Sequence, residues 1–347
     1  FFKNKKTIIF FIFLAINILF SKNQTISLYQ LLRIIELFTV FFIGNQIFKI
    51  IKEKTFLKIL LISSLFQLLL STLQIKFQHS LQGIFYFFGE RLFSLSTPGI
   101  AKGNLNGIEF LRPYATFSHP NSLAGFFLLI YFFILTEKKF NQHFLLKNFI
   151  LLISSILVFI SFSKIAILSF LIINILFLIF VFKSKKSKKI ICYPCFFSKI
   201  FVPFFVSLIF LKATTDPLTL KKRLELIKNS LDIILNNFIF GVGAGNYLLA
   251  QSHYFSKYPL FFNQPVHNIF LLFFSEFGII LGSLIIVLFF NQIKNLIKKN
   301  FFVFLAVFLT GLFDHYWWSL IQNRLILFFI YGIVSSSFLI FRFRSKS

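Results

Sequence analysis

The stretch KNFILLISSILVFISFSKIAILSFLIINILFLIFVFKSKKSKK, residues 147–189, decides the fold class. It contains two almost purely apolar runs, at 148–162 and 165–182, which are joined by the short turn SFSK and followed by a cluster of lysines. Apolar runs of about 20 residues, or shorter runs flanked by lysines, are typical of helices that cross a bilayer. The stretch therefore predicts two membrane-spanning helices connected by a tight turn.

The same pattern extends over the whole chain. Hydrophobic residues make up 57% of the 347 positions and charged residues 13%, against about 25% charged residues in soluble domains. We therefore expect an all-α, polytopic bundle of transmembrane helices that forms one integral-membrane domain over residues 1–347, and the opening Phe1 suggests missing upstream spans. About ten segments qualify as spans: roughly 7–20, 29–50, 56–72, 120–136, 148–162, 165–182, 198–212, 267–290, 300–313 and 319–341.

The basic residues test this topology. Clusters of Lys and Arg precede the first expected span and follow every second one, as they do in the cytoplasmic loops of membrane proteins that meet anionic lipid. We therefore expect a multi-pass protein of the bacterial inner membrane, with membrane lipids as partners. The net charge of +26 is then explained without nucleic acid, which we do not expect as a partner.

Two connections on the opposite, extracytoplasmic side are long, at roughly 73–119 and 213–266. Loops of this length are uncommon unless they are functional. They also hold most of the glycine, proline and polar residues, so the second loop and its flanks are expected to carry the site.

The first long loop ends in RPYATFSHPNSLAG, residues 112–125. A proline after His119 suits the start of a helix, where free backbone amides can bind an anion. His119 and Asn121 are accordingly candidates for ligand contact, or they simply cap a membrane helix. Arg112 can bind phosphate through both guanidinium nitrogens. Lys164 breaks the pattern of cytoplasmic cations, either as a tolerated interfacial lysine or as a charge for an anionic ligand.

The second long loop contains Arg223 and then the glycine-rich run GVGAGNY at 241–247. Alternating glycines allow backbone amides to approach an anion closely, although the run is equally typical of a flexible turn. The candidates in this run are Gly241, Gly243, Gly245 and Asn246.

A third motif, PVHN, stands directly before the next expected span. His267 at the mouth of a helix can act as a general base near neutral pH, or it is only a polar residue at a helix end. Asn268 follows it. Glu276 lies deeper in the apolar run, where ionisable residues are costly and tend to be functional or paired.

Together, the order of these motifs resembles the O-antigen ligase and polymerase superfamily over roughly residues 110–285. The resemblance implies a metal-independent, inverting glycosyltransferase without a cofactor, which transfers a glycan from an undecaprenyl-diphosphate carrier to a hydroxyl of a glycan, lipid or protein acceptor. It assigns His267 to activating the acceptor, and Arg223 and position 164 to the diphosphate. At position 164 the family has arginine where this chain has lysine, and Leu281 replaces a glycine that is frequent in ligases.

Electrostatics gives a mechanism consistent with that assignment. A diphosphate leaving group gains negative charge as its bond to the sugar breaks, and Arg112, Arg223, Lys164 and the glycine-loop amides would stabilise this charge. Two alternatives remain open. One is a polymerase of O-antigen or exopolysaccharide, or a protein O-oligosaccharyltransferase, of the same superfamily. The other is a transporter or flippase of lipid-linked glycan.

Overall fold

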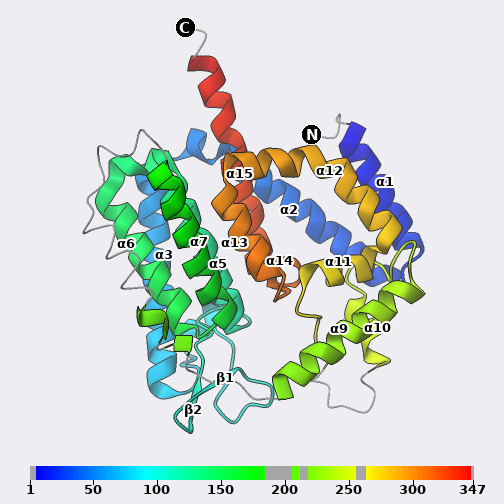
Figure 1. The fold of residues 1–347 in the computed structure, drawn as a ribbon, viewed down its shortest axis with the longest axis horizontal. Coiled ribbons are helices and arrows are strands. Elements are labelled where there is room, and N and C mark those ends of the chain that lie inside the picture. The colour runs from blue at the N-terminus through cyan, green and yellow to red at the C-terminus, as the bar shows by residue number, and fades with distance from the viewer. Residues whose placement is uncertain (1–4, 184–204, 209, 212–217, 255–262, 345–347) are drawn as a thin grey trace. The chain divides into compact units, whose positions relative to one another are not determined.

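The computed structural model describes residues 5–183, 205–208, 210, 211, 218–254 and 263–344 (Figure 1). The chain packs as two compact units, each assembled from separate stretches of sequence. The first unit comprises Phe1–Ile47, Asp216–Phe301 and Gly311–Ser347. The second comprises Phe48–Thr215 and Phe302–Thr310.

The regular secondary structure of the first unit is all helical in its described residues. Its core joins α1 to the end of α11 and the start of α12, where Phe10, Leu14, Phe277, Leu281 and Ile285 are buried together. The helices are α1 (Lys5–Leu19), most of α2 (Gln24–Ile50), α9 (Leu218–Asn236), α10 (Tyr247–Ser252), α11 (Ile269–Phe277), α12 (Ile279–Lys299), α14 (Tyr316–Ser319) and α15 (Ile321–Arg344).

The second unit is a helix bundle with one small hairpin. Helix α5 is buried along most of its length and packs on α6, which also packs on α3. The expected all-α fold misses the antiparallel pair of β1 (Lys102–Leu105) and β2 (Ile108–Leu111). The helices are α3 (Glu53–Phe77), α4 (Ile84–Phe87), α5 (Pro120–Thr136), the 3-10 helix η1 (Lys138–His143), α6 (Phe144–Ile160), α7 (Lys164–Lys183) and most of α13 (Phe301–Gly311).

The prediction of membrane-spanning helices is confirmed, although the number of about ten is not. Among the described residues, five helices are long and apolar enough to cross a bilayer: α2, α3, the run Lys138–Ile160, Lys164–Val181 and α12. Three shorter apolar helices are Pro120–Thr136, Phe301–Gly311 and Ile321–Ser336. Most of the expected span at 198–212 lies outside the described residues.

The expected single span at 267–290 is wrong, because the chain breaks at Gly278 into α11 and α12. Gly278 has a φ of 71°, and an added Cβ would lie 2.6 Å from the carbonyl oxygen of Ile239. The preceding loop fills the break: Ile279 N donates to Phe238 O at 2.8 Å, and Leu281 N donates to Ile239 O at 3.1 Å. The amides freed at the start of α12 are thus satisfied by the chain itself.

Candidate functional site

Two histidines and an aspartate gather in the first unit, around the start of α11 and the segment before α14. Asp314 Oδ1 lies 3.5 Å from His267 Nδ1 and 4.0 Å from His315 Nε2. The two imidazole rings are 5.2 Å apart between centroids. His267 is 17% exposed and Asp314 9%, so this group is largely withdrawn from water but still open on the side of His267.

Asn268 explains why His267 meets Asp314. Its Oδ1 accepts hydrogen bonds from Phe270 N at 2.9 Å and Leu271 N at 3.0 Å, which caps α11. Its Nδ2 donates to Leu312 O at 3.0 Å. One side chain therefore fixes both the start of α11, directly after His267, and the segment that carries Asp314. Asn268 positions the site by supporting the backbone.

His315 is held as a neutral imidazole. Burial lowers the pKa of His315 to about 4, against the opposing effect of the Asp314 carboxylate. Its Nδ1 lies 2.6 Å from Ser319 Oγ, one helical turn further on. At neutral pH the ring is uncharged, so the negative charge of Asp314 is not cancelled by a cationic His315.

Arg223 supplies a positive charge to this group from α9. Its charge is the smallest of the three effects that lower the pKa of the His315 imidazole, after burial and the charge of His267. Helix α9 is fixed against α11 through a core in which Leu226, Val266 and Leu272 are buried. The Arg223 side chain is half-buried, and its Nε has no hydrogen-bond partner among the described residues. A buried donor of this kind is suited to an anionic ligand.

The glycine-rich run does not present the expected set of free amides. Every backbone N–H from 241 to 246 donates within the first unit. The acceptors are Asn237 O, Ser275 O, Glu276 O, Asn17 Oδ1, the Glu276 carboxylate and Gly243 O, in that order. The glycines are needed because the loop runs against α11, the turn between α1 and α2, and α2: a Cβ on Gly243 would lie 2.2 Å from Ser21 Cβ. Gly241, Gly243 and Gly245 thus build the site's support, and Asn246 joins in by donating from Nδ2 to Ser27 Oγ at 2.8 Å.

Glu276 connects this loop to an apolar cavity. Its carboxylate accepts from Trp318 Nε1 at 2.8 Å and from the Gly245 amide. Glu276 lies in α11, whose nine residues are too few to cross a bilayer. Burial raises the pKa of Glu276 to about 7, against the opposing effects of the Trp318 hydrogen bond, the Gly245 amide and the charge of Arg324. Glu276 is therefore a carboxyl group that is only partly ionised at neutral pH.

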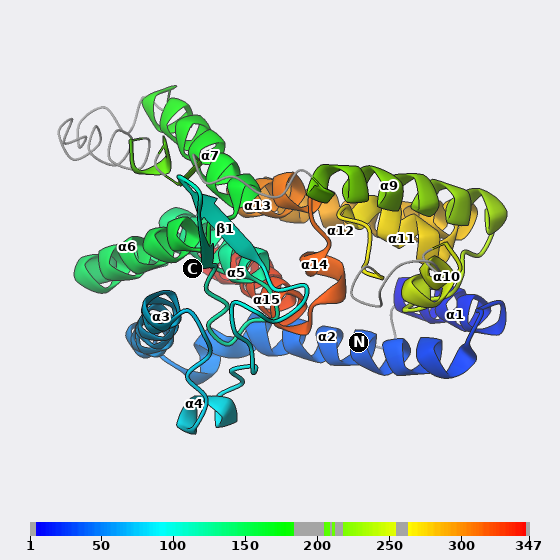
Figure 2. The ribbon, with the colours of Figure 1, turned by 90° about the horizontal axis from the view of Figure 1, so that it is seen from below.

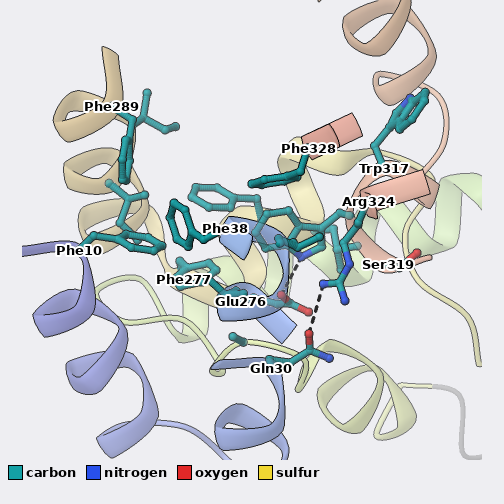
Figure 3. Close-up of a pocket in the computed structure, with 18 of the residues that line it drawn as sticks. Phe10, Gln30, Phe38, Glu276, Phe277, Phe289, Trp317, Ser319, Arg324 and Phe328 are labelled. Carbon is teal, nitrogen blue, oxygen red and sulfur yellow. Dashed lines mark hydrogen bonds between the residues drawn. The ribbon is translucent and has the colours of Figure 1, made fainter. Parts of the chain in front are cut away.

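The cavity has a volume of about 690 Å³ and lies within the first unit. Figure 3 shows aromatic rings, Phe10, Phe38, Phe277, Phe289 and Phe328 among them, around a small polar group that contains Glu276. In that group Arg324 Nη1 donates to Gln30 Oε1 at 3.3 Å. Ligand cavities of this size and character bind mainly apolar molecules and orient them with a few polar contacts.

Arg324 and Gln30 were not expected as site residues. The sequence marks Arg324 only as a cation inside the apolar run of the last expected span, where the topology does not explain a charge. Nothing in the sequence around Gln30 marks it, because a single glutamine is ordinary at the end of a membrane helix.

The remaining candidates belong to the second unit. Arg112 is buried; its Nε donates to Ser161 O at 2.9 Å and its Nη2 to Asn121 Oδ1 at 2.6 Å. Asn121 is itself buried in the first turn of α5. Arg112 therefore holds the turn before α7 against the start of α5. His119 caps α5, because its Nδ1 accepts from Asn121 N at 3.1 Å. Lys164 is the first residue of α7 and is half-buried.

His267, Asp314 and His315 could also hold a metal ion. Each offers one ligand atom, and these atoms lie within 4.8 Å of one another. The positive charge of Arg223 acts on His315 as well and would oppose a cation at this place.

Comparison with known proteins addresses the family. Residues 149–287 match the family model O-Antigen ligase. The resemblance to the O-antigen ligase superfamily is confirmed. The matched segment contains Lys164, Arg223, the glycine-rich run, His267 and Glu276, whereas Arg112, Asp314 and His315 lie outside it. No curated protein and no solved structure matches the chain. With five helices among the described residues that are long and apolar enough to cross a bilayer, the chain has the character of a multi-pass membrane protein.

Proposed function

We propose that this protein is a metal-independent, inverting glycosyltransferase that transfers a glycan from an undecaprenyl-diphosphate carrier to an acceptor hydroxyl, in the manner of an O-antigen ligase. The observation that carries the proposal is the pairing of His267 with Asp314, at 3.5 Å, beside the charge of Arg223. The distribution of basic residues along the chain supports an orientation in which this site faces away from the cytoplasm. The membrane in this proposal is the bacterial inner membrane.

His267 is the general base. The carboxylate of Asp314 faces Nδ1 and favours the tautomer that carries its proton there, which leaves the lone pair of Nε2 for the acceptor hydroxyl. The separation of 3.5 Å is longer than a hydrogen bond, as is common for catalytic pairs before substrate binds. Asp314 acts as a positioning residue, because it orients His267 and stabilises the imidazolium that forms.

The transfer itself balances without a metal. The acceptor oxygen loses its proton to His267 Nε2 and bonds to the anomeric carbon from the face opposite the diphosphate, so the configuration inverts. The bond between that carbon and the diphosphate oxygen breaks, and its electron pair leaves with the diphosphate. Arg223, with an unpaired buried Nε, stabilises that growing charge. The resemblance assigns Lys164 to the same role, whereas Arg112 has its guanidinium engaged with Ser161 and Asn121.

The aromatic cavity supports a lipid-linked donor. Its walls are apolar, and its volume of about 690 Å³ suits part of an isoprenoid chain better than a free sugar. Polymerases and protein O-oligosaccharyltransferases of the superfamily differ in the acceptor, so the acceptor that is glycosylated identifies the subtype.

The test is transfer in vitro by the purified protein in liposomes that contain undecaprenyl-diphosphate glycan, with candidate acceptors and EDTA. His267→Ala and Arg223→Ala should each lose transfer while keeping the elution profile of the parent in detergent. His253→Ala, an exposed histidine of the same unit, should keep full activity. Full activity of His267→Ala would remove the assignment of the base. If no acceptor is modified while the lipid-linked glycan crosses the bilayer, the protein is a transporter.

A further inference from the structure

The second unit exposes a largely aromatic, apolar surface around α4. Five large side chains between positions 84 and 92 are each at least 60% exposed: Ile84, Tyr86, Phe87, Phe88 and Leu92. Exposing so much contiguous apolar surface to water is unfavourable, and such patches mark sites of contact with a partner or a membrane. The packing around this surface indicates what covers it.

The segment around α4 is fixed by buried hydrogen bonds, so its apolar side chains are exposed on an ordered element. Glu90 is buried, and its carboxylate accepts from Leu81 N at 2.9 Å, Gln82 N at 2.6 Å and Gln74 Nε2 at 2.8 Å. Gln74 lies on α3 and is itself fully buried. The single carboxylate of the segment thus points inward, where its hydrogen bonds hold the segment on α3. The outer face of the segment therefore carries no negative charge.

Phe66 fixes where α4 lies along α3. Its ring centroid is 6.1 Å from that of Phe85 and 5.3 Å from that of Phe88. Phe66 precedes Phe77, the last residue of α3, by eleven positions, which is about 16 Å along a helix. The chain therefore leaves α3 and folds back beside it. Figure 2 shows α4 at the edge of the unit, outside α3, α5 and α6.

The face of α3 at this level is the one that a bilayer would cover. Helix α3 is long and apolar enough to span a membrane, and Ile62 and Leu69 stand four residues before and three after Phe66, hence on the same helical face. Ile62 is 68% exposed and Leu69 54%. The aromatic surface of α4 continues this outward apolar face of the spanning helix.

We propose that α4 is a re-entrant element whose aromatic side chains lie among the acyl chains of the leaflet at the C-terminal end of α3. Lipid fits the surface better than a protein does, because the surface is apolar, carries no negative charge and is continuous with a membrane-spanning face. Tyr86 has the amphipathic ring that prefers the interface. Arg91 stands between Phe88 and Leu92; it is exposed, donates to Ser118 O at 3.3 Å and can meet lipid phosphate.

Site-directed spin labelling in liposomes tests the proposal. The label is placed by Phe87→Cys in a background that carries Cys192→Ser and Cys195→Ser, and Leu92→Cys serves as a second site on the same surface. Ile108→Cys is the matched control, because Ile108 is 73% exposed in the hairpin of the same unit, next to the exposed ion pair of Lys102 and Glu109 at 3.1 Å. Each labelled protein is compared for collision with oxygen, which partitions into lipid, and with a water-soluble nickel chelate.

Labels at positions 87 and 92 should collide with the nickel chelate several-fold less often than the label at 108, and more often with oxygen. Nickel collision rates at 87 and 92 equal to that at 108 would place α4 in water and overturn the proposal. Low collision rates with both reagents would also overturn it, because they would mean that protein, such as a second copy of the chain, covers the surface.

Discussion

The carboxylate of Asp314 lies 3.5 Å from Nδ1 of His267, although α11, α12 and α13 separate the two residues in the chain. Asn268 enforces this meeting by capping α11 and donating to Leu312 O at 3.0 Å. The pair gives His267 an orientation and a counter-charge, which a lone histidine at a helix end lacks. The chemistry proposed above depends on that pair.

Asp314→Asn should lower the turnover of glycan transfer by at least about tenfold, because general-base catalysis contributes about 10²- to 10⁴-fold and the amide no longer fixes the tautomer of His267. The KM for the lipid-linked donor should stay within twofold, since the proposed role of Asp314 is to orient His267 and not to bind the donor. Asp314→Glu should recover part of the turnover, and Asp232→Asn on α9 serves as the matched control. A variant in which KM rises while turnover is kept would assign Asp314 to binding.

Arg223→Ala should lower kcat/KM for the donor by about 10²- to 10³-fold, the range seen when one preorganised charge-stabilising donor is removed. Arg223→Lys should be intermediate, because lysine keeps the charge but not the planar pair of donors. Lys221→Ala removes a neighbouring exposed cation on the same helix and should have little effect. Equal losses in the alanine and lysine variants would show that geometry, not charge, is what Arg223 supplies.

Lys164 tests the resemblance at the position where this chain departs from the family's arginine. Lys164→Arg should keep or increase transfer, because it adds the bidentate fork. Lys164→Gln should reduce transfer by about tenfold or more, in line with about 1.5–3 kcal/mol for a hydrogen bond to a charged group. Initial rates at saturating acceptor measure both. If glutamine is as active as lysine, the charge at this position has no part in the reaction.

The sequence indicated candidate segments for the site but not the contacts between them. PVHN was expected to start a helix, and it does so through the Asn268 cap. The contact between His267 and Asp314 could not be predicted from the sequence, because it depends on the packing of segments that are distant in the chain. For Asp314 and His315 the sequence offered only a polar pair beside tryptophans, which is equally typical of an interfacial belt.

The glycine-rich run shows what spacing does and does not reveal. Glycines at 241, 243 and 245 all have positive φ angles. The groups that approach them belong to α11, to the turn between α1 and α2, and to α2, because a glycine in a sequence indicates a missing Cβ atom and not what fills the space. The break at Gly278 was missed for a related reason: hydropathy runs unchanged through 267–290, and only the glycine itself marks the interruption.

Glu276 should make stability depend on pH. Its pKa is raised from 4.5 to about 7 in the folded protein, so the unfolded chain releases this proton at lower pH than the folded one. The free energy of unfolding should therefore fall by about 3 kcal/mol as pH rises from below 4.5 to above 7, and stay lower beyond. Chemical unfolding in detergent between pH 4 and 8 measures this slope.

Glu276→Gln should remove that slope, because the amide cannot ionise and, like the protonated carboxyl, can still accept from Trp318 Nε1 and the Gly245 amide. Glu225→Gln on α9 should leave the slope as in the parent protein. If Glu276→Gln and the parent protein lose stability equally between pH 4.5 and 7, another group causes the pH dependence and Glu276 is ionised throughout.

Gly243→Ala should destabilise the first unit far more than its backbone angle alone requires. Gly243 and Gly107 have similar φ angles, 94° and 87°, but an added Cβ at 243 would lie 2.2 Å from Ser21 Cβ, whereas at 107 it meets nothing within 4 Å. Gly107→Ala therefore costs only the positive φ, about 1–2 kcal/mol. Gly243→Ala adds overpacking and should exceed it by about 1–3 kcal/mol. Thermal unfolding of both variants measures the difference. The same loop contacts Glu276 and the break at Gly278, so Gly243→Ala should also lower transfer, whereas Gly107→Ala should not. Equal stability of the two variants would mean that the loop does not pack tightly against the turn between α1 and α2.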